Sequence, residues 1–288
     1  MKAAIALTVA MGLLAQAGRR PAATLPSESA GWDNVLAGLL SVFEKADVLA
    51  LGEAHNRKID SDLRLRLIRY PGFASKVHAI VVEATGDQPL LSRYVRGDSL
   101  SAAELLRLWP QRPLQSLREL FETVRDVNQN LPSKALMVYE SPAVGPGQDR
   151  NGPAAAVIRD RVAAGEKVLV IYGSGHTWHR EGGLTTALER SMPGRVFAAE
   201  VFGPVGAQAT GLPGEELQAS LKGLEDTLSS HDRPVLIFLR GTPASRLLAN
   251  PFYLGQEMLP PSTTIGDLDD ACVFFGRAPE LGTSVSGR

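Results

Sequence analysis

Seven short, apolar, β-rich runs recur along the chain, and helical stretches separate them. Such an alternation predicts βαβ units. Each run is apolar on both of its alternating faces, which suits strands of a parallel sheet that helices cover on both sides. The sequence therefore predicts an α/β fold with a mostly parallel central sheet and helices on both faces. The seven runs are Val48 to Leu51, Ala79 to Val82, Ala135 to Tyr139, Val168 to Tyr172, Val196 to Val201, Val235 to Leu239 and Cys272 to Phe275.

Apolar residues return at helical spacing in five connecting stretches, which we expect to be helices. They are Leu63 to Tyr70, Ala102 to Trp109, Leu117 to Asn130, Ala154 to Ala164 and Leu184 to Arg190. Gly165 and Gly194 stand where two of these helices are expected to end. The stretch 203–234 breaks the rhythm, because it combines glycine and proline with an acidic amphipathic segment. We interpret it as an insertion or flap.

The N-terminus has the pattern of a secretory signal peptide. Lys2 is followed by an apolar run from Ala3 to Leu14 and by the small-residue cleavage pattern Ala15-Gln16-Ala17. We therefore expect residues 1–17 to be removed and the protein to be exported, to the periplasm or the medium. Residues 18–288 are expected to form a single α/β domain. No stretch of the sequence predicts a membrane-spanning helix.

Charge and cysteine content narrow the class of protein. The chain carries 30 basic and 31 acidic residues, for a formal net charge of -1, and this balance does not favour nucleic acid as a partner. Cys272 is the single cysteine, so an intramolecular disulfide is excluded. Its apolar neighbours favour a small core residue rather than a catalytic thiol.

Ionisable residues follow three of the predicted strands, at the point where each strand ends. Glu53 and His55 follow the first run, Glu83 the second and His176 the fourth. Because ligands of open α/β sheets bind beyond the carboxyl ends of the strands, we predict that these four residues form a catalytic site. Taken singly, a glutamate at a strand end also suits a helix cap or a salt bridge, and a histidine suits a surface or core position.

This combination of side chains is suited to hydrolysis. Two carboxylates and two imidazoles on one rim can activate water by general-base catalysis. Glu53, His55 and His176 could also hold a divalent metal ion such as zinc or manganese. His179 lies in the same glycine-rich loop as His176, and we predict that it contacts the substrate from the rim. The serine-hydrolase elbow G-x-S-x-G and the common nucleotide-binding motifs are absent from the sequence.

The motifs Leu-Gly-Glu-Ala-His, Val-Val-Glu and Tyr-Gly-Ser-Gly-His, in this order, resemble the superfamily of erythromycin esterases, Tiki-type proteases and ChaN-like haem-binding proteins. The resemblance implies an α/β sheet with its site at the strand ends. It assigns His55 or Glu83 as the base that activates water. It also implies that Arg150, in the motif Asp149-Arg150-Asn151, orients the substrate, whereas the residues alone suit a helix-start salt bridge equally well.

Within this superfamily, the sequence looks closest to the ChaN-like branch. A single residue separates Glu53 from His55, and the segment Gln88 to Tyr94 with Trp109 further on is similar to that branch. The branches differ in what they bind. The resemblance implies no metal for the esterases, a metal for the Tiki-type proteins, and haem held by tyrosine and histidine for the ChaN-like proteins.

Two functions follow from these observations. The first is a hydrolase of an ester or amide, acting on a small-molecule or peptide substrate through the glutamates and histidines at the strand ends. The alternative is a haem-binding or iron-uptake protein without catalysis, for which Tyr94, Tyr139 and Tyr172 are available.

Overall fold

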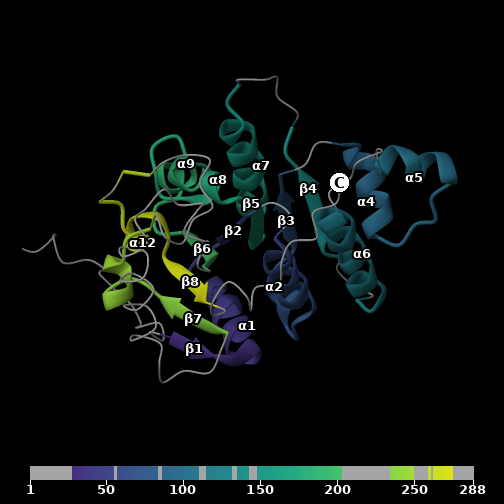
Figure 1. Cartoon of the computed structure of the whole chain (residues 1–288). Coiled ribbons are helices and arrows are strands. Elements are labelled where there is room, and N and C mark those ends of the chain that lie inside the picture. The colour runs from purple at the N-terminus through teal and green to yellow at the C-terminus, as the bar shows by residue number, and fades with distance from the viewer. Residues whose placement is uncertain are drawn as a thin grey trace, which may run out of the picture.

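The computed structural model describes residues 28–54, 57–83, 86–109, 115–131, 135–142, 148–202, 234–249, 259–260 and 262–274. Within these residues, eight strands form one sheet in the order β1-β7-β8-β6-β2-β5-β3-β4, with β1 and β4 at opposite ends (Figure 1). The pairings of β2 with β5 and β6, of β3 with β4 and β5, and of β6 with β8 are parallel. The two pairings that involve β7 are antiparallel. The predicted mostly parallel sheet is confirmed.

The seven predicted runs correspond to β2 through β8. The strands are β1 Glu28–Ala30, β2 Val48–Glu53, β3 Ala79–Val82, β4 Met137–Glu140, β5 Val168–Gly173, β6 Val196–Phe202, β7 Val235–Phe238 and β8 Ala271–Phe274. The edge strand β1 was not predicted. It has three residues and no apolar run, and its pairing with β7 is the contact that makes it a strand.

The five predicted helices correspond to α2, α5, α6, α7 and α9. The α-helices are α1 Gly31–Ser41, α2 Lys58–Arg69, α3 Phe73–Lys76, α4 Gln88–Val95, α5 Ala102–Leu108, α6 Gln115–Gln129, α7 Asn151–Ala163, α8 Ser174–Thr177, α9 Leu184–Ser191 and α12 Ile265–Leu268. Two short 3-10 helices, η1 Val42–Glu44 and η2 Pro243–Arg246, complete the described set. The prediction missed α1, α3, α4, α8 and α12, and α8 lies in the stretch that was expected to be a glycine-rich loop. A capping signal was present for α4, because Asp87 accepts from the backbone N–H of Leu90.

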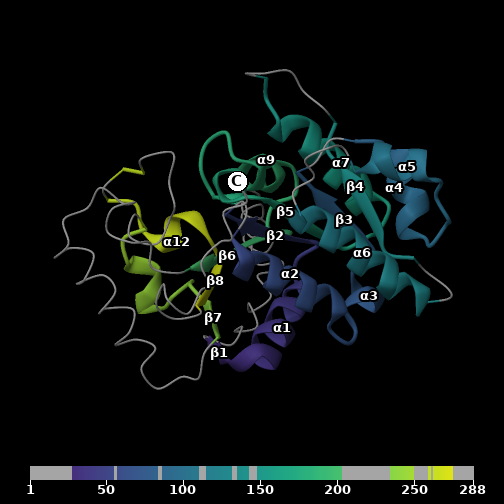
Figure 2. The same ribbon diagram turned by 45° about the vertical axis from the view of Figure 1, so that its right-hand side comes forward.

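Helices cover both faces of the sheet, as predicted. On one face, Leu49, Leu51 and Ile80 pack against the helices α1, α2 and α6. On the other face, Val48 and Ala50 pack against α7 and α9. Figures 1 and 2 show these two helical layers on either side of the strands. The alternation of side chains along each strand explains why adjacent residues of β2 belong to different layers.

Cys272 lies in a third apolar cluster, around β7 and β8. Its thiol is fully buried beside Phe202, Ile237 and Phe274, and burial raises its pKa well above the ordinary value. A thiol held neutral in this way is a poor nucleophile, in agreement with its predicted place in the core.

Other predictions fall beyond the part of the chain that the structure describes. The signal peptide, residues 1–17, lies outside it, as does the insertion or flap at 203–234 except for Pro234, whose carbonyl accepts from Gly31 N. None of the helices in the described ranges has the length and apolar character needed to cross a bilayer.

The short helix α8 packs directly on β2, where Gly52 has no side chain. A Cβ atom at Gly52 would lie 2.6 Å from Thr177 Oγ1 and 3.3 Å from Glu200 Oε2. Both neighbours are buried, so they have little room to move. We expect Gly52→Ala to lower the free energy of unfolding by about 1–3 kcal/mol through overpacking.

Chemical denaturation measures this loss, with Gly175→Ala as the matched control. A Cβ atom at Gly175 meets only Arg180 Nη2, at an ordinary 3.6 Å. Equal stability of the Gly52→Ala protein and the wild type would contradict the packing described here.

Candidate functional site at the strand ends

The carboxyl ends of β2, β5 and β3 lie side by side. Glu53 is the register partner of Gly173 across the parallel pairing of β2 with β5. On the other side of β5, Glu83 donates its backbone N–H to Ile171 O at 3.2 Å, and its Oε2 accepts from Gly173 N at 3.0 Å. The two glutamates therefore flank the end of β5 from its two neighbouring strands.

His176 lies next to Glu83. The distance from His176 Nε2 to Glu83 Oε1 is 3.6 Å, which is too long for a direct hydrogen bond. It is short enough for one bound molecule to form hydrogen bonds with both side chains. His176 Nδ1 lies 2.8 Å from Asn151 Oδ1, and Asn151 Nδ2 donates to Gly182 O at 2.5 Å. Because the Asn151 amide nitrogen donates to the Gly182 carbonyl, the Asn151 amide oxygen faces the imidazole. An amide oxygen can only accept, so Nδ1 of His176 carries the proton. Nε2 is then the basic nitrogen of the neutral ring, and it faces Glu83.

The start of α7 supplies two more side chains to this group. Asp149 accepts from the backbone N–H groups of Asn151 at 2.8 Å and Gly152 at 3.0 Å, and this fixes the first turn. Arg150 Nη1 lies 3.5 Å from Glu83 Oε1, and the Arg150 side chain is 61% exposed. Arg150 thus makes a salt bridge, as the sequence allowed, and its partner is the predicted site residue Glu83.

Glu53 is placed differently. Its Oε2 pairs with the guanidinium of Arg64, a side chain that is almost completely buried. The narrow gap beside this pair has no room for a water molecule. Glu53 therefore neutralises a buried cation on this side, and the structure records no contact between its carboxylate and His176.

His55 lies outside the described residues, so its predicted role stays a prediction. The described residues next to this gap, Ala54 and Arg57, are held by one buried carboxylate. Asp60 accepts from Ala54 N at 3.1 Å, and Arg57 binds both of its oxygens, through Nε at 2.6 Å and Nη2 at 2.8 Å. Arg57 Nη2 also donates to Val201 O at 2.7 Å, which ties this turn to β6.

The prediction missed Glu200, which lies inside β6 and is 3% exposed. Ser174 Oγ donates to its Oε1 at 2.5 Å, and Trp178 Nε1 donates to its Oε2 at 2.8 Å. Burial raises the pKa of Glu200 to about 7, against the lowering effect of both hydrogen bonds. One signal in the sequence could have identified it, because Glu200 is the single charged residue in an otherwise apolar strand.

His179 belongs to a separate pair. Its Nε2 lies 2.9 Å from Asp270 Oδ2, and the same oxygen accepts from Ala198 N at 2.9 Å. Only two residues, Thr177 and Trp178, thus separate a histidine that faces Glu83 from one that faces Asp270. The predicted contact of His179 with a substrate stays a prediction.

The three tyrosines considered for haem already have packing partners. Tyr172 is fully buried, and burial raises its pKa to about 12. The ring of Tyr94 packs edge-on to Trp109, with ring centres 5.5 Å apart, and Arg125 lies over its face. Arg161 lies over Tyr139 and donates to its hydroxyl at 3.2 Å. A haem iron could reach Tyr172 only after rearrangement of the core.

The conditional metal set of Glu53, His55 and His176 includes one residue outside the described ranges. Among the residues that the structure does describe, no three His, Cys, Asp or Glu side chains are placed to hold a metal ion. Glu53 is already paired with Arg64. The metal prediction is therefore left to experiment.

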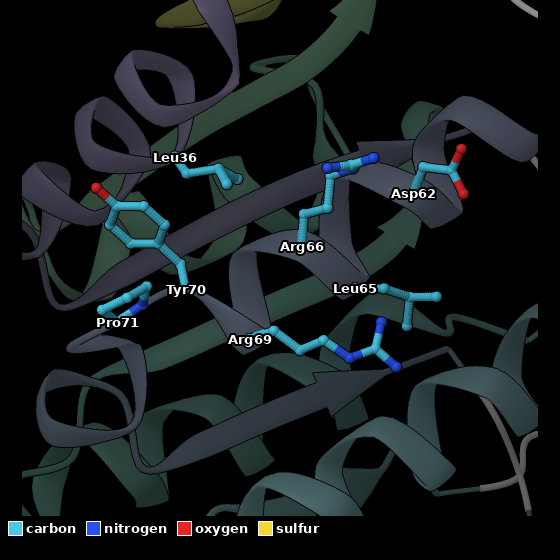
Figure 3. A pocket seen from close by; sticks show the side chains of 7 residues that line it. All are labelled: Leu36, Asp62, Leu65, Arg66, Arg69, Tyr70 and Pro71. Atoms are coloured by element: carbon cyan, nitrogen blue, oxygen red, sulfur yellow. The ribbon is translucent and has the colours of Figure 1, made fainter.

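A surface depression of about 450 Å³ lies between α1 and α2 (Figure 3). Its lining residues are Leu36, Asp62, Leu65, Arg66, Arg69, Tyr70 and Pro71. Arg66 lies over the ring of Trp32, and Arg69 donates to Thr123 Oγ1, so both cations have partners. Because α2 runs back from the carboxyl end of β2 toward the start of β3, its last turn is at the opposite edge of the sheet from Glu83.

The raised pKa of Glu200 predicts a pH-dependent stability. A carboxyl group whose pKa rises on folding binds more protons in the folded state. The free energy of unfolding therefore falls as the pH rises from 4.5, the ordinary pKa of a glutamate, to about 7, the pKa of Glu200 in the folded protein. We expect Glu200→Gln to remove this slope. Between pH 4.5 and pH 7.5, the free energy of unfolding of the variant should rise relative to that of the wild type by an amount on the order of 3 kcal/mol.

Denaturant titrations across this pH range measure the difference, with Glu181→Gln as an exposed control. Asp60, whose pKa burial raises to about 6, keeps part of the slope in both proteins. Parallel pH profiles of the wild type and the Glu200→Gln protein would contradict the expectation.

Comparison with known proteins tests the expected fold. No family model and no curated protein matches the sequence. Among solved structures, a mutant of the erythromycin esterase EreC in its open conformation matches with a TM-score of 0.56 and 12% identity, over 89% of this chain and 99% of that chain. A protein from Bacillus cereus matches with a TM-score of 0.55 and 11% identity, over 86% of this chain and 92% of that chain.

The haem-binding ChaN of Campylobacter jejuni overlaps 58% of this chain and 84% of its own, at 15% identity and a TM-score of 0.39. That score is below the level at which a common fold is inferred, so the ChaN-like branch stays a prediction. The two higher-scoring structures confirm the resemblance at the level of the fold. The chain has the α/β fold of the erythromycin esterase.

Proposed function

We propose that this protein is an exported hydrolase of an ester or amide, and that His176 and Glu83 activate the attacking water. One observation carries the proposal. The basic Nε2 of His176 lies 3.6 Å from Glu83 Oε1, while Nδ1 is held by Asn151. A water molecule or substrate hydroxyl placed between the imidazole and the carboxylate can bind both groups.

In this mechanism, Nε2 of His176 takes a proton from water as the water oxygen attacks the carbonyl carbon. The negative charge of Glu83 stabilises the imidazolium that forms. Asn151 keeps the ring in the tautomer whose Nε2 accepts the proton. The tetrahedral intermediate then loses its alcohol or amine, which takes the proton from the imidazolium. The exposed guanidinium of Arg150, 3.5 Å from Glu83, can orient a carbonyl oxygen or an acidic group of the substrate.

The fold supports this reaction class in a general way. The erythromycin esterase that shares the fold is named for the hydrolysis of an ester. In our proposal the predicted residues Glu53 and His55 complete the rim, with Glu53 held by Arg64 as the neighbouring carboxylate. A fold hosts many activities, so the side chains named here carry the proposal.

Substitution of the two central residues tests the activity. With chromogenic esters and anilides as probes, we expect Glu83→Gln and His176→Ala each to lower kcat/KM by about 100-fold or more, because both remove the activation of water. Glu140→Gln is the matched control, since Glu140 ends the adjacent strand β4 and its carboxylate lies against Gly86. His78→Gln, at the start of β3, is the histidine control.

The same assay separates the alternatives. Loss of activity with a chelator and its return with zinc or manganese would indicate a metal-dependent hydrolase. Absence of turnover in the wild type, together with a saturable Soret band on adding haem, would replace our proposal with the haem-binding alternative. Full activity of the Glu83→Gln protein would refute the role of Glu83.

Export is a separate part of the proposal, supported by the pattern of residues 1–17. When the full chain is produced in a bacterial host, we expect the protein outside the cytoplasm with Gly18 as its first residue. Leu13→Arg places a charge in the apolar run and should keep the protein in the cytoplasm. Fractionation with mass spectrometry measures both. A wild-type protein that stays in the cytoplasm and keeps residues 1–17 would contradict export.

A further inference from the structure

The position of His176 depends on a helix that is too short to be stable alone. The helix α8 consists of Ser174–Thr177, a single turn. An isolated turn of this length is unstable in water, because nucleating a helix restricts several residues for one hydrogen bond. Contacts with the rest of the protein must therefore hold α8 in place.

A single buried carboxyl group binds both ends of this turn. Glu200 accepts from Ser174 Oγ, at the first residue of α8, and from Trp178 Nε1, at the residue that follows its last. His176 lies between these two residues. Gly52 leaves the space in which the carboxyl group and α8 meet, because a side chain there would lie 3.3 Å from Glu200 Oε2.

The other contacts of α8 hold different parts of it. Thr185 Oγ1 donates to Thr177 O at 2.5 Å, and Arg180 Nε donates to Gly175 O at 3.1 Å. Both act on the backbone of the turn. The His176 ring itself is held by Asn151, on α7. The carboxyl group of Glu200 fixes the turn from the sheet side.

An apolar residue at position 200 would avoid the cost of desolvating the buried Glu200 carboxyl group. A role in core packing alone therefore does not explain a glutamate at this position. The residues that share its face of β6, Ala198 and Phe202, are apolar and buried. Desolvation of a carboxyl group in the interior costs free energy, and the hydrogen bonds from Ser174 and Trp178 offset part of that cost. A site whose geometry must be fixed is where such a cost is commonly retained.

We propose that Glu200 is a positioning residue, which fixes α8 through Ser174 and Trp178 and thereby holds the His176 ring against Glu83. The proposal deepens the proposed function and rests on it for the catalytic meaning of His176. The placement of the ring can be measured without any substrate.

Two variants of Glu200 test the proposal. Glu200→Gln keeps both contacts, because its amide oxygen accepts from Trp178 and its amide nitrogen donates to Ser174. Glu200→Leu removes both hydrogen bonds and puts an apolar side chain of similar volume in their place. The chain contains five histidines, so the ring resonances of nitrogen-15-labelled histidine can be assigned with His176→Ala.

In the Glu200→Leu protein, we expect the His176 resonances to lose the Nδ1-protonated pattern that Asn151 imposes, while those of His179 stay unchanged. In the Glu200→Gln protein, the His176 resonances should match the wild type. With ester probes, Glu200→Leu should lower kcat at least tenfold and change KM by less than threefold, and Glu200→Gln should restore most of kcat.

An unchanged His176 spectrum in the Glu200→Leu protein would overturn the positioning role, whatever the activity of the wild type. An altered spectrum without any wild-type turnover would keep the positioning role and reject the proposed function. If Glu200→Leu does not fold, Trp178→Phe removes one of the two hydrogen bonds and keeps an aromatic ring. A wild-type His176 spectrum in the folded Trp178→Phe protein then overturns the proposal, and an altered one supports it.

Discussion

The parallel, in-register pairing of β2, β5 and β3 is the constraint on which the candidate site depends. It places Glu53 beside Gly173 and lets the backbone N–H of Gly173 donate to Glu83. Parallel strands end at the same edge of a sheet, so residues that are far apart in the chain meet there. The chain then turns from β5 directly into α8, which returns His176 to within 3.6 Å of Glu83.

Three buried ionisable side chains, Arg64, Asp60 and Glu200, lie near this edge, and each has its own partners. Arg64 is neutralised by Glu53, and Asp60 is bound by both arms of the Arg57 guanidinium. Glu200 has no described cation in hydrogen-bond contact, and its pKa rises to about 7. Breaking one of these contacts would leave a buried polar group without a partner, which is costly. Each arrangement therefore restricts how the neighbouring backbone can move. These polar contacts hold Ala54, Arg57 and Ser174 in place at the strand ends.

Much of the fold could be predicted from local patterns, and part of the site as well. The apolar runs from Val48 to Cys272 identified seven strands, because a strand covered on both faces must be apolar along its whole length. Glu83 and His176 were predicted together, because each follows such a run. By contrast, β1 has no apolar pattern and is defined by its partner β7. Glu200 was not predicted because it lies within β6, and its partners Ser174 and Trp178 come from a distant part of the chain.

The sequence by itself determined the class of fold, the buried state of Cys272 and the set of polar residues at the strand ends, since these follow from the spacing of apolar residues along the chain. The tertiary structure alone decided which polar residues meet. It paired Glu53 with Arg64, His179 with Asp270, and His176 with Glu83 and Asn151. The physical reason is that hydrogen bonds and ion pairs act over a few ångströms between segments that are distant in sequence, and only the folded chain brings those segments together.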